Sequence, residues 1–294
     1  MKYTTIAVIY NPNSTGSSKT LAKQFAASLH TALPKQKVEL IATKYAGHAE
    51  ELAYKLAKST KHPLIISSSG DGGYNEVING ALKAQTEGFK PTTGLLPAGN
   101  ANDHFTNLNK RDLVELITKD ISRKIDVLKY TYTAKGEVVE RYAHSYIGFG
   151  LTPFVGKELN KNKLNLINEV FIVGKAILGV KSVKLKVGRK TRRYDSIVLS
   201  NIDKMSKYLK ISQPSGITDG KFEVTTFRKR NKISLIAMLL KASLIGLKEN
   251  AKVSSYSVHT VNKTILQADG EIVTVDANTT VKITAEKQLL NCVI

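Results

Sequence analysis

Cysteine is nearly absent from this chain of 294 residues, which contains only Cys292. A single cysteine excludes a disulfide within the chain and favours a reducing compartment such as the cytoplasm. Long apolar runs are also missing, since no stretch reaches the roughly 18 uninterrupted apolar residues that a membrane-spanning helix needs. Residues 1–10 predict a first strand and lack the apolar core and cleavage site of a signal peptide. We therefore expect a cytoplasmic globular protein.

Acidic residues are scarce, with 24 against 44 lysines and arginines, so the formal net charge is +20. Such a charge attracts polyanions, namely nucleic acid, nucleotides or an anionic membrane surface. The basic residues concentrate at 181–193 and 228–232, where few aromatic residues are interleaved. Nucleic-acid binding uses such aromatics for base stacking, and we therefore expect no nucleic-acid partner. A solvated basic surface and a membrane-facing surface both remain open.

The length and the order of patterns predict two domains. Up to residue 127, strand patterns alternate with helix patterns, which indicates an α/β domain with a parallel sheet and helices on both faces. From residue 128 to 294, closely spaced strands indicate an antiparallel β-sandwich or barrel. Helical segments at 160–180 and 233–247 interrupt it, and their apolar stripes suit packing or lipid contact. The expected strands of the second domain span 127–132, 138–147, 182–187, 196–200, 221–227, 253–261, 264–267 and 279–284.

The most informative segment is residues 69–77, Ser-Gly-Asp-Gly-Gly-Tyr-Asn-Glu-Val. It follows the apolar run Leu64–Ile66, which predicts a buried strand, and it precedes a helix that begins near Val77. Glycines let the backbone approach a ligand closely, and the N–H groups at a helix start attract an anion. Asp71 does not suit an anion and indicates a metal ion that bridges to phosphates. A tight strand-to-helix turn is the structural alternative.

Two further loops follow strand patterns in the same half of the chain. Residues 95–103, Leu-Leu-Pro-Ala-Gly-Asn-Ala-Asn-Asp, again end in an aspartate, and residues 11–17, Asn-Pro-Asn-Ser-Thr-Gly-Ser, are rich in turn formers. Ligands of parallel α/β sheets bind at the carboxyl ends of the strands, where such loops lie. Three of them on one half-chain predict a nucleotide site.

Taken in order, these segments resemble the diacylglycerol kinase catalytic-domain family of lipid kinases, in its bacterial soluble form, which is related to sphingosine kinases. Residues 11–16 resemble the family's N-P-x-S-G opening with one residue inserted, residues 70–77 resemble G-D-G-T-x-N-E-V, and residues 99–103 resemble the start of G-T-x-N-D-F. Smaller matches follow at Thr43 with Gly47-His48-Ala49, at 147–150, at 218–224, and at Asp269-Gly270-Glu271. The resemblance spans nearly the whole chain.

The resemblance implies a two-domain enzyme with its active site in the interdomain cleft, ATP on residues 1–127 and the lipid on residues 128–294. The sequence leaves open whether residues 289–294 return to the first domain. By matching position, Asp269 would be the base that takes the proton of the lipid hydroxyl, and Glu271 would support it or the metal. The residues that would contact ATP are Asn11, Pro12, Asn13, Ser14, Thr43, Gly70, Asp71, Gly72, Gly73, Tyr74, Asn75, Glu76, Gly99, Asn100 and Asn102.

Metal ligands also follow from the resemblance. Asp71, Asp103 and Asp126 would hold Mg²⁺ through carboxylates or water. Asp219 matches a position linked to a second, structural metal in the family. Both Asp269-Gly270 and the turn around Asp219 equally suit tight hairpin turns.

The chain departs from the family at four places. Gly73 and Asn100 each replace a threonine, His104 stands where an aromatic residue is usual, and residues 207–210 lack the glycines common there. These departures bear on phosphate geometry, nucleotide preference and the lipid substrate. None removes a carboxylate that the mechanism needs.

Three functions fit these observations. The first is ATP-dependent phosphorylation of a lipid hydroxyl, with diacylglycerol as the leading acceptor and a peripheral, electrostatic association with anionic membranes. The second is a kinase for a soluble acceptor such as NAD, because NAD kinases resemble this family in a G-G-D-G loop and a β-rich second domain. The third is a nucleotide- or lipid-binding protein without turnover. The acyl chains of the lipid and the oligomeric state, including a homodimer, stay open.

Overall fold

The computed structural model describes residues 2–14, 17–108, 111–153, 179, 181–205, 209–210, 216–237 and 251–294. Two compact units make up the chain. Unit 1 comprises Met1–Ile125 with Gln288–Ile294, and unit 2 comprises Asp126–Lys287. The roles expected for the two parts, ATP binding and lipid binding, stay predictions.

Unit 1 is built on a parallel sheet. Strands β2 (Lys37–Ala42), β1 (Thr5–Tyr10), β3 (Pro63–Ser69) and β4 (Thr92–Pro97) lie side by side in that order. All three pairings are parallel. Cys292 and Val293, near the chain end, also pair with β4 in parallel. The buried apolar residues of β1 and β3 form the centre of this sheet, because strands covered on both faces favour continuous apolar runs.

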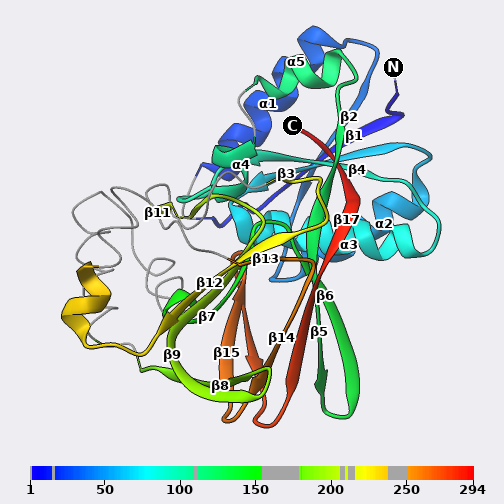
Figure 1. Ribbon diagram of the computed structural model, residues 1–294. Helices are drawn as coiled ribbons and strands as arrows, with labels where there is room; N and C mark the ends of the chain where they lie inside the picture. Colours follow the sequence, from blue (N-terminus) through cyan, green and yellow to red (C-terminus); the bar gives the residue numbers. More distant parts are fainter. Residues whose placement is uncertain are drawn as a thin grey trace. The chain divides into compact units, whose positions relative to one another are not determined.

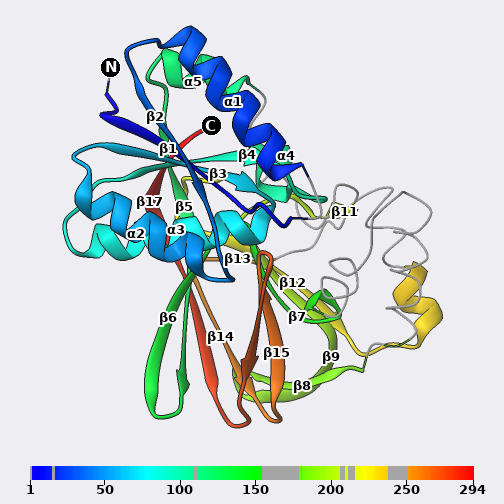
Figure 2. The same cartoon turned by 180° about the vertical axis from the view of Figure 1, so that it is seen from behind.

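Helices cover both faces of the sheet (Figure 1 and Figure 2). Helices α1 (Ser18–Ala32) and α5 (Leu113–Thr118) contribute Phe25, Leu29 and Leu116 to one apolar cluster with β1 and β3. Helices α2 (His48–Ser59) and α3 (Asp71–Thr86) lie together on the other side. The short helix α4 (Asp103–Leu108) follows β4. The predicted α/β architecture is confirmed.

The start of α3 differs from the expectation. The sequence predicts a loop over residues 69–77, yet the helix begins at Asp71, so that Gly72 and Gly73 lie in its first turn. The N–H of Tyr74 donates to the carbonyl of Gly70 at 3.1 Å and closes that turn. The glycines weaken the helix signal in the sequence, but the buried side chains of Tyr74 and Val77 anchor the helix from its first turn.

Unit 2 is an antiparallel β structure, as predicted. Its main strand order is β16-β15-β7-β9-β8-β14-β17, with β12 joined to β9 and β13, and with β5 joined to β6 and β17. The described pairings within unit 2 are antiparallel. The strand bounds are β5 Arg123–Ala134, β6 Glu137–Ala143, β7 Tyr146–Gly150, β8 Val183–Val187, β9 Lys190–Ser200, β10 Lys204–Met205, β11 Leu209–Lys210, β12 Phe222–Arg228, β13 Ala251–Val253, β14 Ser255–Thr260, β15 Thr264–Ala268, β16 Glu271–Val275 and β17 Thr280–Val293.

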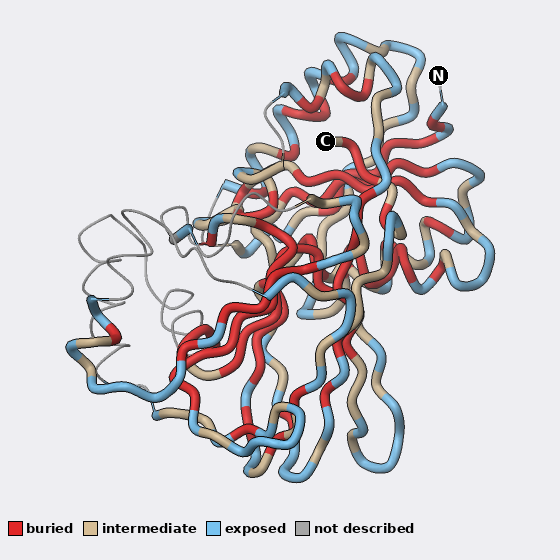
Figure 3. Tube along the Cα trace, viewed as in Figure 1, coloured by how far each residue is buried: buried red, intermediate tan, exposed pale blue. Residues whose placement is uncertain are grey.

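Figure 3 shows burial concentrated along the strands and exposure at the hairpin tips. An apolar cluster in the core of unit 2 includes Tyr130, Phe149, Phe222 and Ile283. Among the described residues, no helix combines the length and the apolar character needed to cross a membrane.

Several predicted strand bounds were wrong. The strand expected at 138–147 is two strands, β6 and β7, because the N–H groups of His144 and Ser145 donate to a side chain and leave the ladder. β16 was missed, and β17 continues from Thr280 to Val293 instead of ending at 284. Of the helical segment expected at 233–247, residues 232–237 are helical. The remainder of that segment, and nearly all of 160–180, lie outside the described residues.

Gly80 allows α2 and α3 to pack closely, which gives a test of the fold. A Cβ at Gly80 would clash with the carbonyl oxygen of Glu50 and lie 3.0 Å from the Cβ of Ala53. We expect Gly80→Ala to lower the free energy of unfolding by about 1–3 kcal/mol, the usual cost of overpacking. Chemical denaturation measures this loss.

This expected loss of stability is opposite to the effect of helix propensity, since alanine at a solvent-exposed helix position is more stable than glycine by about 1 kcal/mol. The matched control is Ala27→Gly at an exposed position of α1. A Gly80→Ala variant as stable as the parent chain would contradict the close packing of these helices.

Candidate nucleotide and phosphotransfer site

The loops that follow β3 and β4 touch through their backbones. The two strands end in register at Ser69 and Pro97, and the N–H of Ala98 donates to the carbonyl of Ser69 at 2.9 Å. A Cβ at Gly70 would lie 3.0 Å from the Cα of Gly99, and a Cβ at Gly99 would overlap Gly70. Only glycine permits this approach. Two of the three predicted loops are therefore brought together.

Asp71 connects these two loops. Its carboxylate accepts hydrogen bonds from the N–H groups of Asp103 at 2.9 Å and His104 at 3.1 Å, at the start of α4. Asp103 itself is 2% exposed. Asp71 therefore joins the loop after β3 to the start of α4.

The departure at His104 is accommodated by Tyr74. The two rings lie 5.2 Å apart between centroids with a tilt of 53°. Both side chains are buried, and the Tyr74 hydroxyl lies 3.1 Å from Oγ1 of Thr93. Burial raises the pKa of Tyr74 well above its ordinary value, so its hydroxyl stays neutral. The imidazole thus occupies an aromatic packing position.

Asn102 closes the second loop on itself. Its Oδ1 accepts from the N–H of Gly99 at 2.9 Å, and its Nδ2 donates to the carbonyl of Gly99 at 2.8 Å. Its φ of 51° is left-handed, which asparagine tolerates better than most residues. Asn100, by contrast, is exposed.

The departure at Gly73 is explained by Ser69. A Cβ at Gly73 would lie 2.7 Å from both Cβ and Oγ of Ser69. The Ser69 hydroxyl also lies 2.7 Å from that of Ser67 and donates to the carbonyl of Gly70. The hydroxyl of Ser69 therefore lies next to the position that the family's threonine would occupy.

The first loop is tied to β3 by Ser18, a residue that sequence reasoning missed. The hydroxyl of Ser18 accepts from the N–H of Asn11 and donates to the carbonyl of Ser68, and the Ser68 hydroxyl donates to the carbonyl of Ser18. Ser18 and Ser68 are fully buried. The serine run 67–69 at the end of an apolar strand was the available signal. The exposed residues Asn11, Pro12 and Asn13 and the half-buried Ser14 follow the end of β1.

Three other predicted contact residues have structural partners. Oε2 of Glu76 accepts from the N–H of Ala49 at 3.2 Å and so joins α3 to the start of α2. The carbonyl of the buried Asn75 accepts from Nδ2 of Asn79. The N–H of Thr43 donates to the carbonyl of Tyr10 at 2.9 Å. Their predicted contacts with ATP stay predictions.

In unit 2, Asp269 is fully buried and its carboxylate accepts three backbone hydrogen bonds. Oδ1 accepts from the N–H groups of Ser145 and Tyr146 at 2.9 and 3.0 Å, and Oδ2 accepts from that of His144 at 2.8 Å. Nε2 of His144 lies 3.3 Å from Oδ2, and Nδ1 lies 2.7 Å from Oγ of Ser145. Three N–H groups and the imidazole thus lie against this carboxylate.

Two opposing effects act on the protonation of Asp269. Burial raises its pKa above the ordinary value, while the imidazole of His144 and the three N–H groups lower it, and the net direction is upward. Asp269 has a left-handed φ of 50°, and its carboxylate accepts from the N–H groups of the turn between β6 and β7. Glu271 makes a separate contact, since both of its carboxylate oxygens lie 3.2 Å from one guanidinium nitrogen of Arg141.

Asp126 and Asp219 are also in unit 2, where they hold one turn. The buried Asp126 accepts from the N–H of Gly220 at 2.6 Å and donates its own N–H to Ile217. Asp219 accepts from the N–H of Lys221 at 3.0 Å, and its other oxygen lies 2.6 Å from Nζ of Lys252. Within the described ranges, no group of three or more acidic, histidine or cysteine side chains is arranged to hold a metal.

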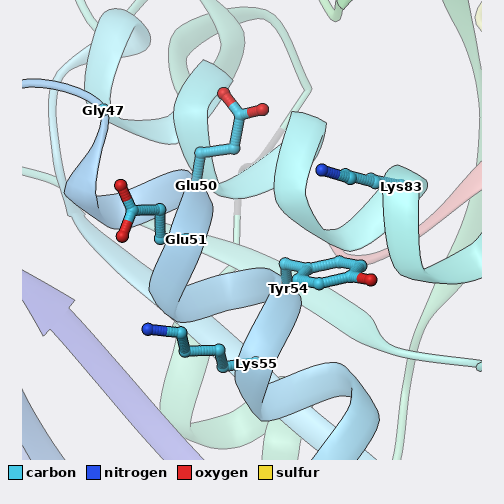
Figure 4. A pocket seen from close by; sticks show the side chains of 6 residues that line it. All are labelled: Gly47, Glu50, Glu51, Tyr54, Lys55 and Lys83. Atoms are coloured by element: carbon cyan, nitrogen blue, oxygen red, sulfur yellow. The ribbon is translucent and has the colours of Figure 1, made fainter.

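A pocket is formed by residues of α2 and α3 together with Gly47, and none of the predicted site residues lines it (Figure 4). Its walls carry both signs of charge, and Nζ of Lys83 lies 4.9 Å from the ring centroid of Tyr54. The residues that line it are Gly47, Glu50, Glu51, Tyr54, Lys55 and Lys83. None of them was predicted to bind a ligand.

Comparison with known proteins agrees with the geometry. Residues 5–130 match the model of the diacylglycerol kinase catalytic domain. A diacylglycerol kinase from Bacillus subtilis (strain 168) is 23% identical over 283 residues, which cover 90% of this chain and 88% of the relative. Sphingoid long-chain bases kinase 1 from Arabidopsis thaliana is 35% identical over 120 residues, 40% of this chain and only 15% of that protein's length.

Solved structures share the fold. A diacylglycerol kinase from Bacillus anthracis str. Sterne superposes with a TM-score of 0.68 at 16% identity and covers 100% of this chain and 97% of its own. Yeast NADH kinase, solved in complex with NADH, gives a TM-score of 0.51 at 11% identity, covering 99% of this chain and 83% of its own. Residues 5–130 thus match the diacylglycerol kinase catalytic domain, and over 90% of its length the chain is similar to a diacylglycerol kinase, in agreement with the loop motifs and the close contact of Gly70 with Gly99. These similarities support a lipid kinase enzyme.

Proposed function

We propose that this lipid kinase transfers the γ-phosphate of ATP to the hydroxyl of diacylglycerol and so produces phosphatidic acid. The observation that carries the proposal is the backbone contact of Gly70 with Gly99, which joins the loops after β3 and β4. Phosphoryl transfer depends mainly on positioning and on electrostatic stabilisation of the phosphates. A rigid glycine-rich surface at the start of α3 supplies both.

The nucleotide would lie against the ends of β1, β3 and β4. The N–H groups and the dipole at the start of α3 favour the phosphates. Asn11–Ser14 and Gly99–Asn102 would flank them, and Ser69 would offer the hydroxyl that Gly73 lacks. Ser18 keeps the first of these loops fixed to β3.

Asp71 and Asp103 are the residues that would hold Mg²⁺. Carboxylate oxygens are the ligands that this ion prefers, and the carboxylate of Asp71 lies beside the N–H of Asp103 at the start of α4. When bound, the ion supplies positive charge against the phosphate oxygens. Asp126 would act at a distance, by fixing the turn at 217–220.

Asp269 is the proposed base for the lipid hydroxyl. A base needs an acceptor position for the incoming proton, and three backbone N–H groups and the imidazole of His144 lie against this carboxylate. The imidazole of His144 makes the longest contact, at 3.3 Å, and is the one that the hydroxyl would replace. The three N–H groups would then keep Oδ1 and Oδ2 in place. Glu271, held by Arg141, would support the turn beside it.

The pH dependence of kcat/KM, which reports the free enzyme, tests this role. The base must be ionised, and its pKa is raised by burial, so kcat/KM is lost as the pH falls through that raised pKa. The imidazole of His144 lowers this pKa in the free enzyme, and its removal raises it further. We expect His144→Gln to shift the acid limb of the kcat/KM profile to higher pH. His30→Gln, at an exposed position of α1, is the control. An unmoved acid limb in His144→Gln would contradict the assignment of Asp269.

The basic surface of β8 and β9 supports binding to an anionic membrane. Lys184 lies directly opposite Arg193 across the two strands, and both are exposed. Like charges in such a pair destabilise a sheet, so a negatively charged partner would relieve a cost that the free protein bears. Lys186 is two residues further along β8 than Lys184 and therefore lies on the same face of the sheet.

A liposome test follows from this surface. Replacement of Lys184, Lys186 and Arg193 by glutamine removes three charges, each worth about 1 kcal/mol near an anionic surface. We expect sedimentation with phosphatidylserine vesicles to fall sharply and to lose most of its salt dependence. The control replaces three exposed lysines of unit 1, Lys23, Lys35 and Lys61, and changes the net charge equally. Equal losses in both variants would show that overall charge, and not this surface, governs binding.

The reaction itself is tested with labelled Mg-ATP. A panel of lipids in mixed micelles and NAD are offered as acceptors, and label on diacylglycerol is expected. Asp71→Asn keeps one oxygen but loses the negative charge, and we expect at least about a hundredfold loss of kcat, in the range of a lost electrostatic contact. Thr106→Ala, on the exposed side of α4, is the control. Label on NAD alone would favour the soluble-acceptor kinase, and ATP binding without any labelled product would favour a non-catalytic protein.

A further inference from the structure

The ammonium of Lys252 lies between two carboxylates in unit 2. Its Nζ is 2.6 Å from Oδ2 of Asp219 and 3.7 Å from Oε1 of Glu223. Lys252 is on β13 directly opposite Glu223 on β12, so the position of the ammonium follows from strand register as well as from the ion pair. Opposite charges directly across a sheet stabilise the pair.

The burial of Glu223 favours a cation at this place. Glu223 is only 5% exposed, and burying a carboxylate costs free energy unless the carboxylate is paired. Asp219 has little freedom to turn elsewhere. Its Oδ1 accepts from the N–H of Lys221. A Cβ at Gly216 would lie only 2.8 Å from its Oδ2, so the backbone of Gly216 packs close to that oxygen.

The turn that contains Asp219 is also bound by Asp126. The N–H of Gly220 donates to Oδ2 of Asp126, and the N–H of Asp126 donates to the carbonyl of Ile217. Asp126 thus holds Ile217 and Gly220, on either side of Asp219, and Asp219 itself pairs with Lys252. The ion pair adds a second connection to the same turn.

We propose that Lys252 serves as a built-in cation in this chain and takes the place of the structural metal expected at Asp219. A divalent ion would need Oδ2 of Asp219 within about 2.0–2.6 Å and several more oxygens around it. The ammonium already lies against that oxygen and would repel a second cation. The residues at Asp219 therefore do not fit a metal while Lys252 is present. This inference is independent of the proposed kinase reaction.

Thermal unfolding with and without Mg²⁺ or Ca²⁺ tests the proposal on the full chain. If a cation raises the Tm of the parent protein, we expect the same rise in the Asp219→Asn variant, because carboxylates other than Asp219 would cause it. Lys252→Met keeps the carbon chain and removes the charge. It is expected to lower Tm by about 2–4 °C, the shift that corresponds to roughly 1 kcal/mol in a chain of this size.

Lys252→Met is also expected to gain a cation response that the parent lacks, because the ammonium that contacts the carboxylates of Asp219 and Glu223 is then gone. The double variant Lys252→Met/Asp219→Asn should lose this response. Lys58→Met is the matched control, since that ammonium pairs with the single carboxylate of Glu87 at 2.7 Å and should gain none. Lys252→Gln serves the same purpose if the methionine variant does not fold.

Two results would overturn the proposal. One is a cation-induced rise in Tm of the parent protein that disappears in Asp219→Asn, which would place a metal at Asp219 beside the lysine. The other is the absence of any new cation response in both Lys252→Met and Lys252→Gln, which would show that the ammonium does not occupy a cation site. Neither result depends on kinase activity, so both are distinct from a failure of the proposed function.

Discussion

The close approach of Gly70 and Gly99 is the constraint on which the predicted nucleotide site depends. Parallel pairing of β3 and β4 brings the two strand ends to one edge, and the missing side chains let the loops touch there. Only with the loops in contact can the carboxylate of Asp71 reach the N–H groups that begin α4. The position of Asp103 and the packing of His104 on Tyr74 follow from that connection.

The aspartates predicted to do chemistry also hold the backbone. Asp71 accepts two N–H groups, Asp269 accepts three, and Asp126 accepts one while its own N–H fixes the same turn. A buried carboxylate that satisfies several donors is strongly placed, because its loss would leave those donors without partners. At each of these residues the carboxylate that is predicted to do chemistry also holds the local backbone. A neutral variant would therefore disturb both the proposed chemistry and the local structure.

The sequence predicted the kinds of elements better than their ends. Apolar runs identified the buried strands, and the glycine-rich segments marked the correct strand ends. The start of α3 could not be predicted, because two glycines oppose helix propensity and the anchoring by Tyr74 is tertiary. The break between β6 and β7 depends on Asp269, which is more than 120 residues away. Ser18 was missed for the same reason, since its partner Ser68 lies 50 residues further along. Lys252 lies in no motif of the sequence, and its proposed role follows only from the register of β12 and β13.

Isothermal titration of Mg-ATP against Gly99→Ala, beside the parent protein, tests the central claim most directly. A methyl group at this position must push the loop away from Gly70, while β3 and β4 stay paired. The account predicts that nucleotide affinity falls by at least about tenfold, or roughly 1.4 kcal/mol, while far-UV circular dichroism still reports a folded chain. Unchanged affinity in a folded Gly99→Ala variant would show that the contact of the two loops does not form the nucleotide site.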